Sequence, residues 1–275
     1  MIEVTPKVYL LGATHVFYDS LEEYLKDTDN LDFLNDIREA QEKHNLTDVD
    51  ILTSFFAKLC YLALSVGLNA NITRTRSIRS NITNTMESGH GSVFEHCQFN
   101  FVLSDVSRVL THELVRHRIG VAFSQESGRY CRIPKEGSGM FIPTCIRENP
   151  EALTIYKEAV DVNTPYIQKL YKIFGIDAEN FTEKKILTSA IRRIAPTGSA
   201  NEIGISLNTR SLRHIIGMRT SRHAEEEIRI VFSEMAKIIE EKYPLMLHGG
   251  ISEEVNGIDE WTFPKLHGYE RDNEN

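Results

Sequence analysis

Residues 116–130 read RHRIGVAFSQESGRY, a stretch that combines three arginines with a run of small and polar residues. Such a run can hold an anion with backbone N–H groups while Arg129 closes on it. Taken alone, the stretch is also typical of a cation-rich helix end followed by a turn. If Arg116 and Arg118 are helical, they project about 200° apart. Unless the helix ends between them, this geometry predicts sites shared between chains.

Hydrophobic periodicity around this stretch indicates a mixture of strands and helices. Alternating apolar residues at 97–103 predict a half-buried strand, and Ser104 and Asp105 suit the start of a helix that runs to Arg118. The remaining predicted elements are helices at 149–174 with a break near Pro165, at 182–194 and at 224–243, and a strand at 201–207.

Length and composition favour one globular domain over residues 1–275. The chain is 41% hydrophobic and 25% charged, and it contains no repeat or Gly/Ser-rich linker. A net charge of −8 argues against nonspecific binding to nucleic acid or to an anionic membrane. The first residues lack a signal-peptide pattern, and Lys58 interrupts the longest apolar stretch. We therefore expect a soluble, cytoplasmic protein with no membrane span.

Charge is distributed unevenly along the chain. Residues 19–50 hold eleven acidic residues against three basic ones, which predicts a solvated helical face or an acidic insertion at about 13–50. Residues 74–132 hold eight arginines and no lysine, which indicates planar, bidentate recognition of carboxylate or phosphate.

Metal and thiol chemistry find little support in the sequence. His112 and His117 in HELVRH are five positions apart, whereas zinc ligands on one helix face need a spacing of four, so no metal site is expected. No glycine-rich phosphate loop of the common kinds is present. Among the cysteines, Cys60 and Cys97 are expected in the core, and Cys131 and Cys145 are expected to be incidental.

Four separated blocks form a recognisable pattern. They are GHGSVFEH at 89–96, RHR at 116–118 with SGR at 127–129, Arg192 ahead of Pro196, and NTRSL at 208–212 followed by Arg219 and by SRHAEEEIR at 221–229. In this order they resemble the flavin-dependent thymidylate synthase family over roughly the C-terminal two-thirds of the chain. The spacer at 119–126 has eight residues, one more than the family pattern. We expect the extra residue to form a bulge at 120–122, where Gly120 tolerates a positive φ.

The resemblance implies an α+β fold, with an antiparallel sheet and long helices, assembled as a homotetramer. It implies FAD-dependent reductive methylation of dUMP at C5 to dTMP, with methylenetetrahydrofolate and NADPH as co-substrates. It implies no covalent cysteine nucleophile.

The resemblance also implies roles for individual residues. Arg219 and His90 are the catalytic candidates: Arg219 would stabilise charge on a pyrimidine oxygen, and His90 would close over the flavin ring. The implied flavin contacts are Ser92, Glu95, Arg116, His117, Arg118, Gln125, Asn208, Arg210 and His214. The implied nucleotide contacts are Glu113, Arg116, Gln125, Glu126, Ser127, Gly128, Arg129, Arg192 and Arg219.

Two alternatives remain open from the sequence. The longer spacer is compatible with a paralogue that methylates UMP or hydroxymethylates dUMP. A non-catalytic protein that binds nucleotide or nucleic acid through Arg74, Arg76 and Arg79 is the alternative of another class, although no aromatic residue lies between these arginines to stack on bases. The choice between NADPH and NADH is not determined by the sequence.

Overall fold

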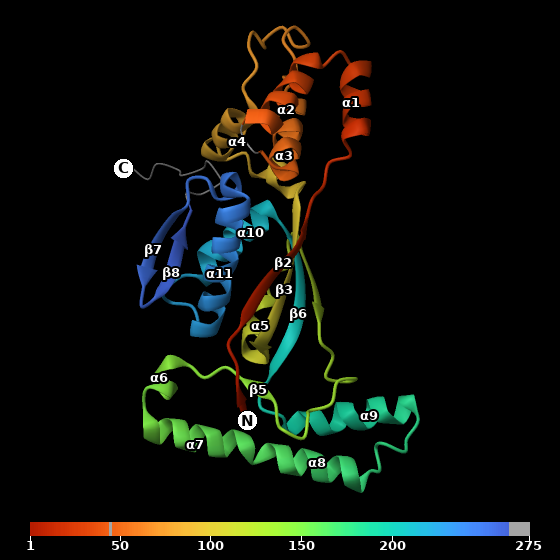
Figure 1. Cartoon of the computed structure of the whole chain (residues 1–275), viewed down its shortest axis with the longest axis vertical. Coiled ribbons are helices and arrows are strands. Elements are labelled where there is room, and N and C mark those ends of the chain that lie inside the picture. The colour runs from red at the N-terminus through yellow and green to blue at the C-terminus, as the bar shows by residue number, and fades with distance from the viewer. Residues whose placement is uncertain (44–45, 264–275) are drawn as a thin grey trace, which may run out of the picture.

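The computed structural model describes residues 1–43 and 46–263, and its centre is a four-stranded antiparallel sheet (Figure 1). The strands lie in the order β2-β3-β6-β4. They are β2 (Lys7–Ala13), β3 (Gln98–Ser107), β6 (Ala200–Asn208) and β4 (Val121–Gln125). The expected α+β fold with an antiparallel sheet is therefore confirmed.

The main hydrophobic core lies between this sheet and two helices, α10 (Thr209–Arg219) and α11 (Glu226–Lys242). Phe101 of β3 pairs with Ile205 of β6, and both side chains are almost fully buried. Because alternate residues of a strand point to one face, a row of apolar side chains meets the helices. Buried residues of this core include Phe99, Leu103, Ile203, Leu207, Leu212, Ile216, Val231 and Phe232.

Helices cover the two ends of the elongated molecule (Figure 1). One end holds α1 (Tyr18–Asp27), α2 (Leu31–Lys43), α3 (Asp48–Leu59) and α4 (Ile78–Glu87). The other end holds α6 (Thr144–Arg147), α7 (Pro150–Asp161), α8 (Asn163–Ile173) and α9 (Phe181–Ile191). The shorter elements are α5 (Arg108–Leu114), η1 (Gly91–Glu95), η2 (Arg192–Ile194), η3 (Pro244–Leu247), β1 (Ile2–Glu3), β5 (Gly139–Met140), β7 (Ile251–Val255) and β8 (Ile258–Thr262).

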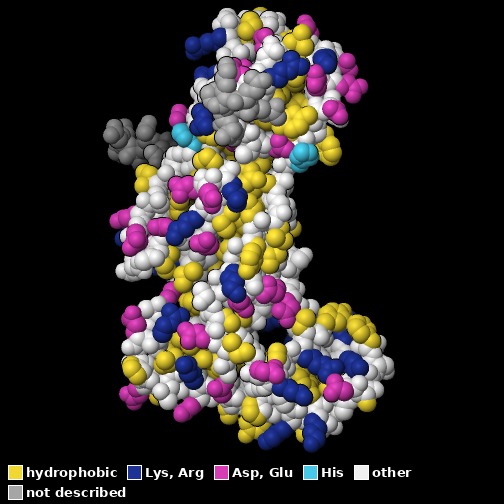
Figure 2. Space-filling view, in the orientation of Figure 1, with side chains coloured by type: hydrophobic (Ala, Val, Ile, Leu, Met, Phe, Trp, Pro, Cys, Tyr) yellow, Lys and Arg dark blue, Asp and Glu magenta, His cyan; other side chains and the backbone are white. Residues whose placement is uncertain are grey.

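Both ends of the molecule expose hydrophobic side chains. Hydrophobic side chains lie exposed at the α8–α9 end of the molecule (Figure 2), among them Ile173, Phe174 and Phe181. No helix in the described ranges is long and apolar enough to cross a lipid bilayer.

The described part of the acidic segment folds as α1, α2 and the start of α3, and several of its acids have partners, namely Glu22, Asp32, Asp36, Asp48 and Asp50. Asp36 accepts a hydrogen bond of 2.8 Å from Lys58, whose side chain is only 2% exposed. Asp50 forms a capping box with Thr47 at the start of α3 and is buried. Asp48 accepts from Tyr18. Asp50 is thus buried and not part of a solvated face, and an insertion at 13–50 stays a prediction.

The predicted helix start at Ser104 is wrong, because β3 continues to Ser107. Asp105 adopts a φ of +59°, and the register with β6 shifts between Leu103 and Val106, which is the signature of a β-bulge. The hydroxyl of Ser107 then caps α5 by accepting from the N–H of Leu110. Since α5 ends at Leu114, Arg116 and Arg118 lie beyond the helix, and their predicted separation on a helix does not apply.

Other boundaries differ in smaller ways. The long helix predicted at 149–174 is divided at Val162, just ahead of Pro165, which lacks the N–H that would bond to Asp161. The helix predicted at 182–194 ends at Ile191 and continues as η2. Cys97 is buried as expected, but Cys60 is exposed, so its expected place in the core is wrong.

The spacer at 119–126 forms a turn followed by β4. Gly120 has a φ of +66°, which confirms the expected backbone conformation. The five residues from Val121 to Gln125 pair with β6 in an unbroken register, so the predicted bulge at 120–122 is wrong. Regular pairing is favoured here because Val121 and Phe123 pack against the core on one face of the strand.

Candidate functional site

The guanidinium of Arg219, at the end of α10, joins two residues that lie more than a hundred positions earlier. Its Nε donates to Nε2 of His117 over 2.9 Å, and its Nη1 donates to Oε2 of Glu113 over 2.8 Å. Its Nη2 donates to the backbone carbonyl of Glu113 over 3.1 Å. Each Nη keeps one further N–H, so the held guanidinium can still donate to a ligand.

His117 is neutral at this position. Burial, followed by the charge of Arg219 and the neighbouring His214 and Arg116, lowers the pKa of His117 to about 4. A neutral imidazole whose Nε2 accepts a hydrogen bond has its proton on Nδ1. The His214 ring lies edge-on at 6.2 Å between centroids. The cluster therefore presents the cation of Arg219 beside an uncharged histidine.

This arrangement predicts a pH dependence of stability. The pKa of His117 falls from 6.5 to about 4 on folding, so between these pH values His117 binds a proton in the unfolded chain but not in the folded protein. The free energy of unfolding should thus decrease as pH falls from about 6.5 toward 4, with no such contribution above that window. In His117→Gln this slope should be smaller, as measured by urea unfolding at several pH values. The exposed His223→Gln is the control, and equal slopes in all three proteins would contradict the assignment.

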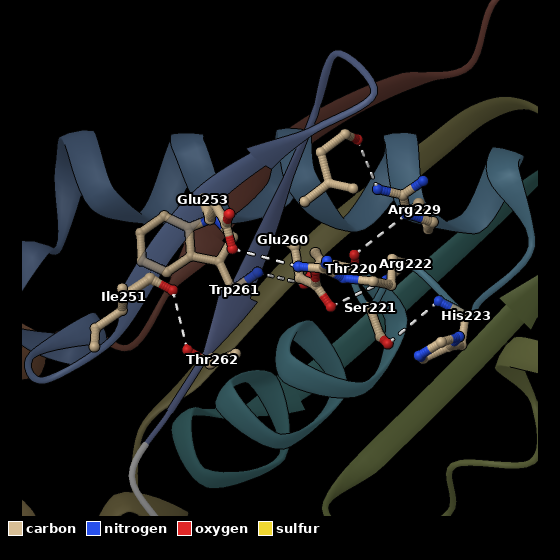
Figure 3. A network of polar contacts seen from close by, with 11 residues as sticks. Thr220, Ser221, Arg222, His223, Arg229, Ile251, Glu253, Glu260, Trp261 and Thr262 are labelled. Carbon is tan, nitrogen blue, oxygen red and sulfur yellow. Dashed lines mark hydrogen bonds and ion pairs between the residues drawn. The ribbon is translucent and has the colours of Figure 1, made fainter.

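The β7–β8 hairpin fixes the chain directly after Arg219 (Figure 3). The Thr220 hydroxyl accepts from the N–H of Trp261 over 2.8 Å, and the Thr220 carbonyl accepts from Nε of Arg229 over 3.3 Å. Arg222 pairs with Glu260 of β8 over 2.7 Å. The end of α10, and with it Arg219, is thus held by Arg222 and Arg229 of the block at 221–229 and by Glu260 and Trp261 of the hairpin. The sequence analysis did not identify the two hairpin residues, because they lie outside the motifs and left no local signal.

A second group of predicted flavin contacts meets where η1 packs on α10. Nη1 of Arg210 donates to Oε1 of Glu95 over 2.5 Å. Gly91 permits this approach, because a Cβ there would lie 3.1 Å from Nε of Arg210. Asn208 caps α10 by accepting from the N–H of Ser211 over 2.8 Å. Arg210 and Asn208 therefore lie at the beginning of the helix that ends in Arg219.

The exposed basic side chains around these groups have few partners. Arg116 and Arg118 form no ion pair within the described part of the chain, and both are exposed. His214 is also exposed. Ionic ligands can reach these side chains.

Several predicted nucleotide contacts line or border a pocket of about 680 Å³ between β6, η2 and the turn after β4. Glu126, Gly128 and Arg192 line it. A Cβ on Gly128 would lie 3.1 Å from Nη1 of Arg192 and 3.3 Å from Nη2 of Arg108. Two guanidinium groups thus converge on a bare backbone. Arg108 was not among the predicted contacts, although it belongs to the arginine-rich span.

Other predicted contacts lie outside this pocket. Gln125 points into the protein, where its Nε2 donates to Asn201 over 2.6 Å and to Thr111 over 3.0 Å. Ser127 and Arg129 do not line the pocket, and the Ser127 hydroxyl accepts from the N–H of Arg129 over 3.3 Å. His90 and Ser92 line a different pocket beside α3 and α4. The predicted residues therefore lie in four places: around Arg219, where η1 packs on α10, in the pocket at Arg192, and in the pocket beside α3 and α4.

The chain matches the family model described as thymidylate synthase complementing protein over residues 44–245. It belongs to the flavin-dependent thymidylate synthase family. A flavin-dependent thymidylate synthase from Mycobacteroides abscessus is 33% identical over 190 residues, covering 66% of this chain and 73% of the relative. One from Corynebacterium glutamicum is 32% identical over 205 residues, covering 72% and 79%. The family resemblance read from the motifs is confirmed, and with it the assignment to an enzyme family.

A solved structure supports the fold of this family member. The UMP/dUMP methylase PolB from Streptomyces cacaoi, bound with 5-Br dUMP, superposes with a TM-score of 0.60 over 89% of this chain and 94% of that chain. The sequences are 18% identical, so the likeness concerns the fold.

Proposed function

We propose that the protein catalyses the FAD-dependent reductive methylation of dUMP at C5 to dTMP, with methylenetetrahydrofolate and NADPH as co-substrates. One observation is the main support: Glu113, His117 and Arg219 converge through three hydrogen bonds. Such a cluster can hold a guanidinium rigidly against a pyrimidine oxygen. Negative charge that develops there during reduction of the ring would be stabilised by donors already in place.

The residues present fit FAD. A dinucleotide diphosphate needs exposed cations, and Arg116 and Arg118 provide them, while Arg210 lies over the bare backbone of Gly91. FAD, once bound and reduced, supplies the hydride for the methylene carbon. The protein's own part is to bind the flavin through Ser92, Glu95, Asn208 and the arginines, and to keep His117 uncharged beside it.

Arg108 and Arg192 are proposed to bind the phosphate of dUMP at the backbone of Gly128. Their guanidinium groups can each donate two parallel hydrogen bonds to phosphate oxygens. Glu126 fixes Arg108, whose Nη2 donates to the Glu126 carbonyl over 3.3 Å. Ser127 and Arg129 would complete the site from the adjoining turn.

A covalent cysteine nucleophile is not part of the proposal. Burial raises the pKa of the Cys97 thiol, and burial together with Glu126 raises the pKa of Cys131. A thiol with a raised pKa is protonated at neutral pH and is a poor nucleophile. We also propose a homotetramer, for which the exposed apolar side chains of the α8–α9 end are suitable contacts.

The test is to incubate the purified protein with FAD, NADPH and methylenetetrahydrofolate, supplying dUMP and UMP in parallel, and to weigh the products. We expect dTMP from dUMP. Faster conversion of UMP, or a hydroxymethylated product, would contradict the proposed substrate or reaction. A protein that takes up no FAD would contradict the proposal as a whole.

The two ligand surfaces should separate in binding experiments. Arg210→Ala should weaken FAD binding at least about tenfold, because it loses a charge-assisted contact at the start of α10. Arg129→Ala should weaken dUMP binding by about ten- to a hundredfold and leave FAD bound. Calorimetric titration measures both, with the exposed Arg147→Ala as a control that affects neither ligand. If each variant lost both ligands equally, the division into two surfaces would be wrong.

A further inference from the structure

A second pocket, beside α3, α4 and η1, has a volume of about 380 Å³ and a marked excess of positive charge. Its lining includes Lys58, Arg74 and Arg76, and no Asp or Glu among the described residues. The larger pocket near Arg192, by contrast, includes three acids among its lining residues. In a chain with a net charge of −8, a pocket with only basic charges is suited to an anionic ligand.

The three cations of this pocket differ in their availability. The ammonium of Lys58 is buried and bonded to Asp36 over 2.8 Å. Arg74 and Arg76 are exposed and form no ion pair with any described residue. Asn81 adds a neutral donor, since its Oδ1 accepts from Ser54 and its Nδ2 forms no hydrogen bond with any residue that the structure describes. The pocket thus offers two guanidinium groups and an amide to carboxylate or phosphate oxygens.

The position of the pocket connects it to the proposed flavin site. His90 and Ser92 line it, and they belong to the same short segment whose Gly91 and Glu95 contact Arg210. The hydroxyl oxygen of Tyr61 lies 3.4 Å from Nδ1 of His90, and the Tyr61 ring lines the pocket. The segment at 90–95 therefore lines the basic pocket with some of its residues and contacts Arg210 with others.

We propose that this pocket binds the anionic tail of a co-substrate whose reactive ring lies at the flavin. The assignment rests on the proposed function. The shared chemistry is a group of carboxylate or phosphate oxygens at one end of the molecule, paired with Arg74 and Arg76. Either the glutamate tail of the folate or the phosphates of the nicotinamide dinucleotide provide such a group, and steady-state kinetics can separate the two sources.

The experiment compares Arg74→Gln and Arg76→Gln with wild type in the flavin-loaded enzyme. The first arm measures KM for methylenetetrahydrofolate with one and with five glutamates, and the second measures KM for NADPH in flavin reduction without folate. We expect about a tenfold increase in KM per arginine in one arm, with kcat nearly unchanged. An increase confined to the pentaglutamate identifies the folate tail, and an increase for NADPH identifies the dinucleotide.

The control is Arg38→Gln, an exposed arginine outside the pocket that pairs with Glu22. A second readout uses Cys60, which lines the pocket and is exposed, in a Cys131→Ser/Cys145→Ser background. The bound tail should slow alkylation of Cys60 by iodoacetamide. Unchanged KM values in both arms, together with unprotected Cys60, would overturn this proposal while dTMP formation by wild type still upheld the proposed function. A wild-type enzyme that formed no dTMP would instead overturn the proposed function.

Discussion

Replacing Arg219 with lysine should lower turnover at least about a hundredfold, which corresponds to about 2.7 kcal/mol in the activation barrier, while FAD stays bound. The guanidinium donates through Nε, Nη1 and Nη2 to His117 and to two oxygens of Glu113. A lysine ammonium carries its donors on one atom and cannot reproduce this planar fork. The charge is kept, but its position against the substrate oxygen is lost.

The measurement is kcat with saturating substrates, together with the flavin absorbance of the purified variant. Arg147→Lys is the matched control, because Arg147 is also ion-paired, in its case with Glu3, and lies outside the site. Loss of activity specific to Arg219→Lys supports transition-state stabilisation by Arg219. Unchanged turnover in Arg219→Lys would remove this residue from the mechanism.

Periodicity was a sound guide to the fold wherever a segment has one buried face. The alternation at 97–103 and the amphipathic run at 224–243 correspond to β3 and α11. It failed at Asp105, where a left-handed residue lets the strand continue through a bulge. Polar residues such as Ser104 and Asp105 suit both a helix start and a bulge, and only the pairing with β6 distinguishes them.

Individual residues of the site could be predicted from the sequence, but the contacts that join them could not. Short motifs identified Glu113, His117 and Arg219, which the fold then joined through hydrogen bonds. Arg108 and the hairpin residue Trp261 were missed, because their roles arise from the register of β3 with β6 and from packing on the end of α10. Such contacts join residues far apart in sequence and leave no periodic trace.

The turn at Ile119 and Gly120 connects the arginine triplet to the start of α10. The Ser211 hydroxyl donates to the Ile119 carbonyl over 2.7 Å, and the Asn208 N–H donates to the Gly120 carbonyl over 3.0 Å. The first residues of the spacer thus contact Asn208, which caps α10. Because β4 pairs regularly with β6, the geometry of the spacer depends on this turn and not on a bulge in the strand.

Gly120→Ala should therefore destabilise the protein by about 2–3 kcal/mol and weaken FAD binding. The φ of +66° costs a residue with a side chain about 1–2 kcal/mol. The new Cβ would also lie 2.3 Å from Nδ2 of Asn208 and 2.6 Å from Oγ of Ser211. Displacing Asn208 removes the helix cap, which adds about 1 kcal/mol.

Urea unfolding and FAD titration measure these two effects, and Gly257→Ala in the β7–β8 turn is the matched control. Gly257 has a φ of +76°, but nothing lies within 4 Å of the position of an added Cβ. Its substitution therefore reports the backbone cost alone, and the difference between the two variants isolates the contact with Asn208. Equal destabilisation, with FAD affinity unchanged in Gly120→Ala, would mean that the turn does not hold Asn208 in place. A larger loss of stability in Gly120→Ala than in Gly257→Ala, together with weaker FAD binding, would show that the start of α10 contributes to binding the cofactor. The first residues of the spacer would then support FAD binding through Asn208, and no substitution within β4 should have the same effect.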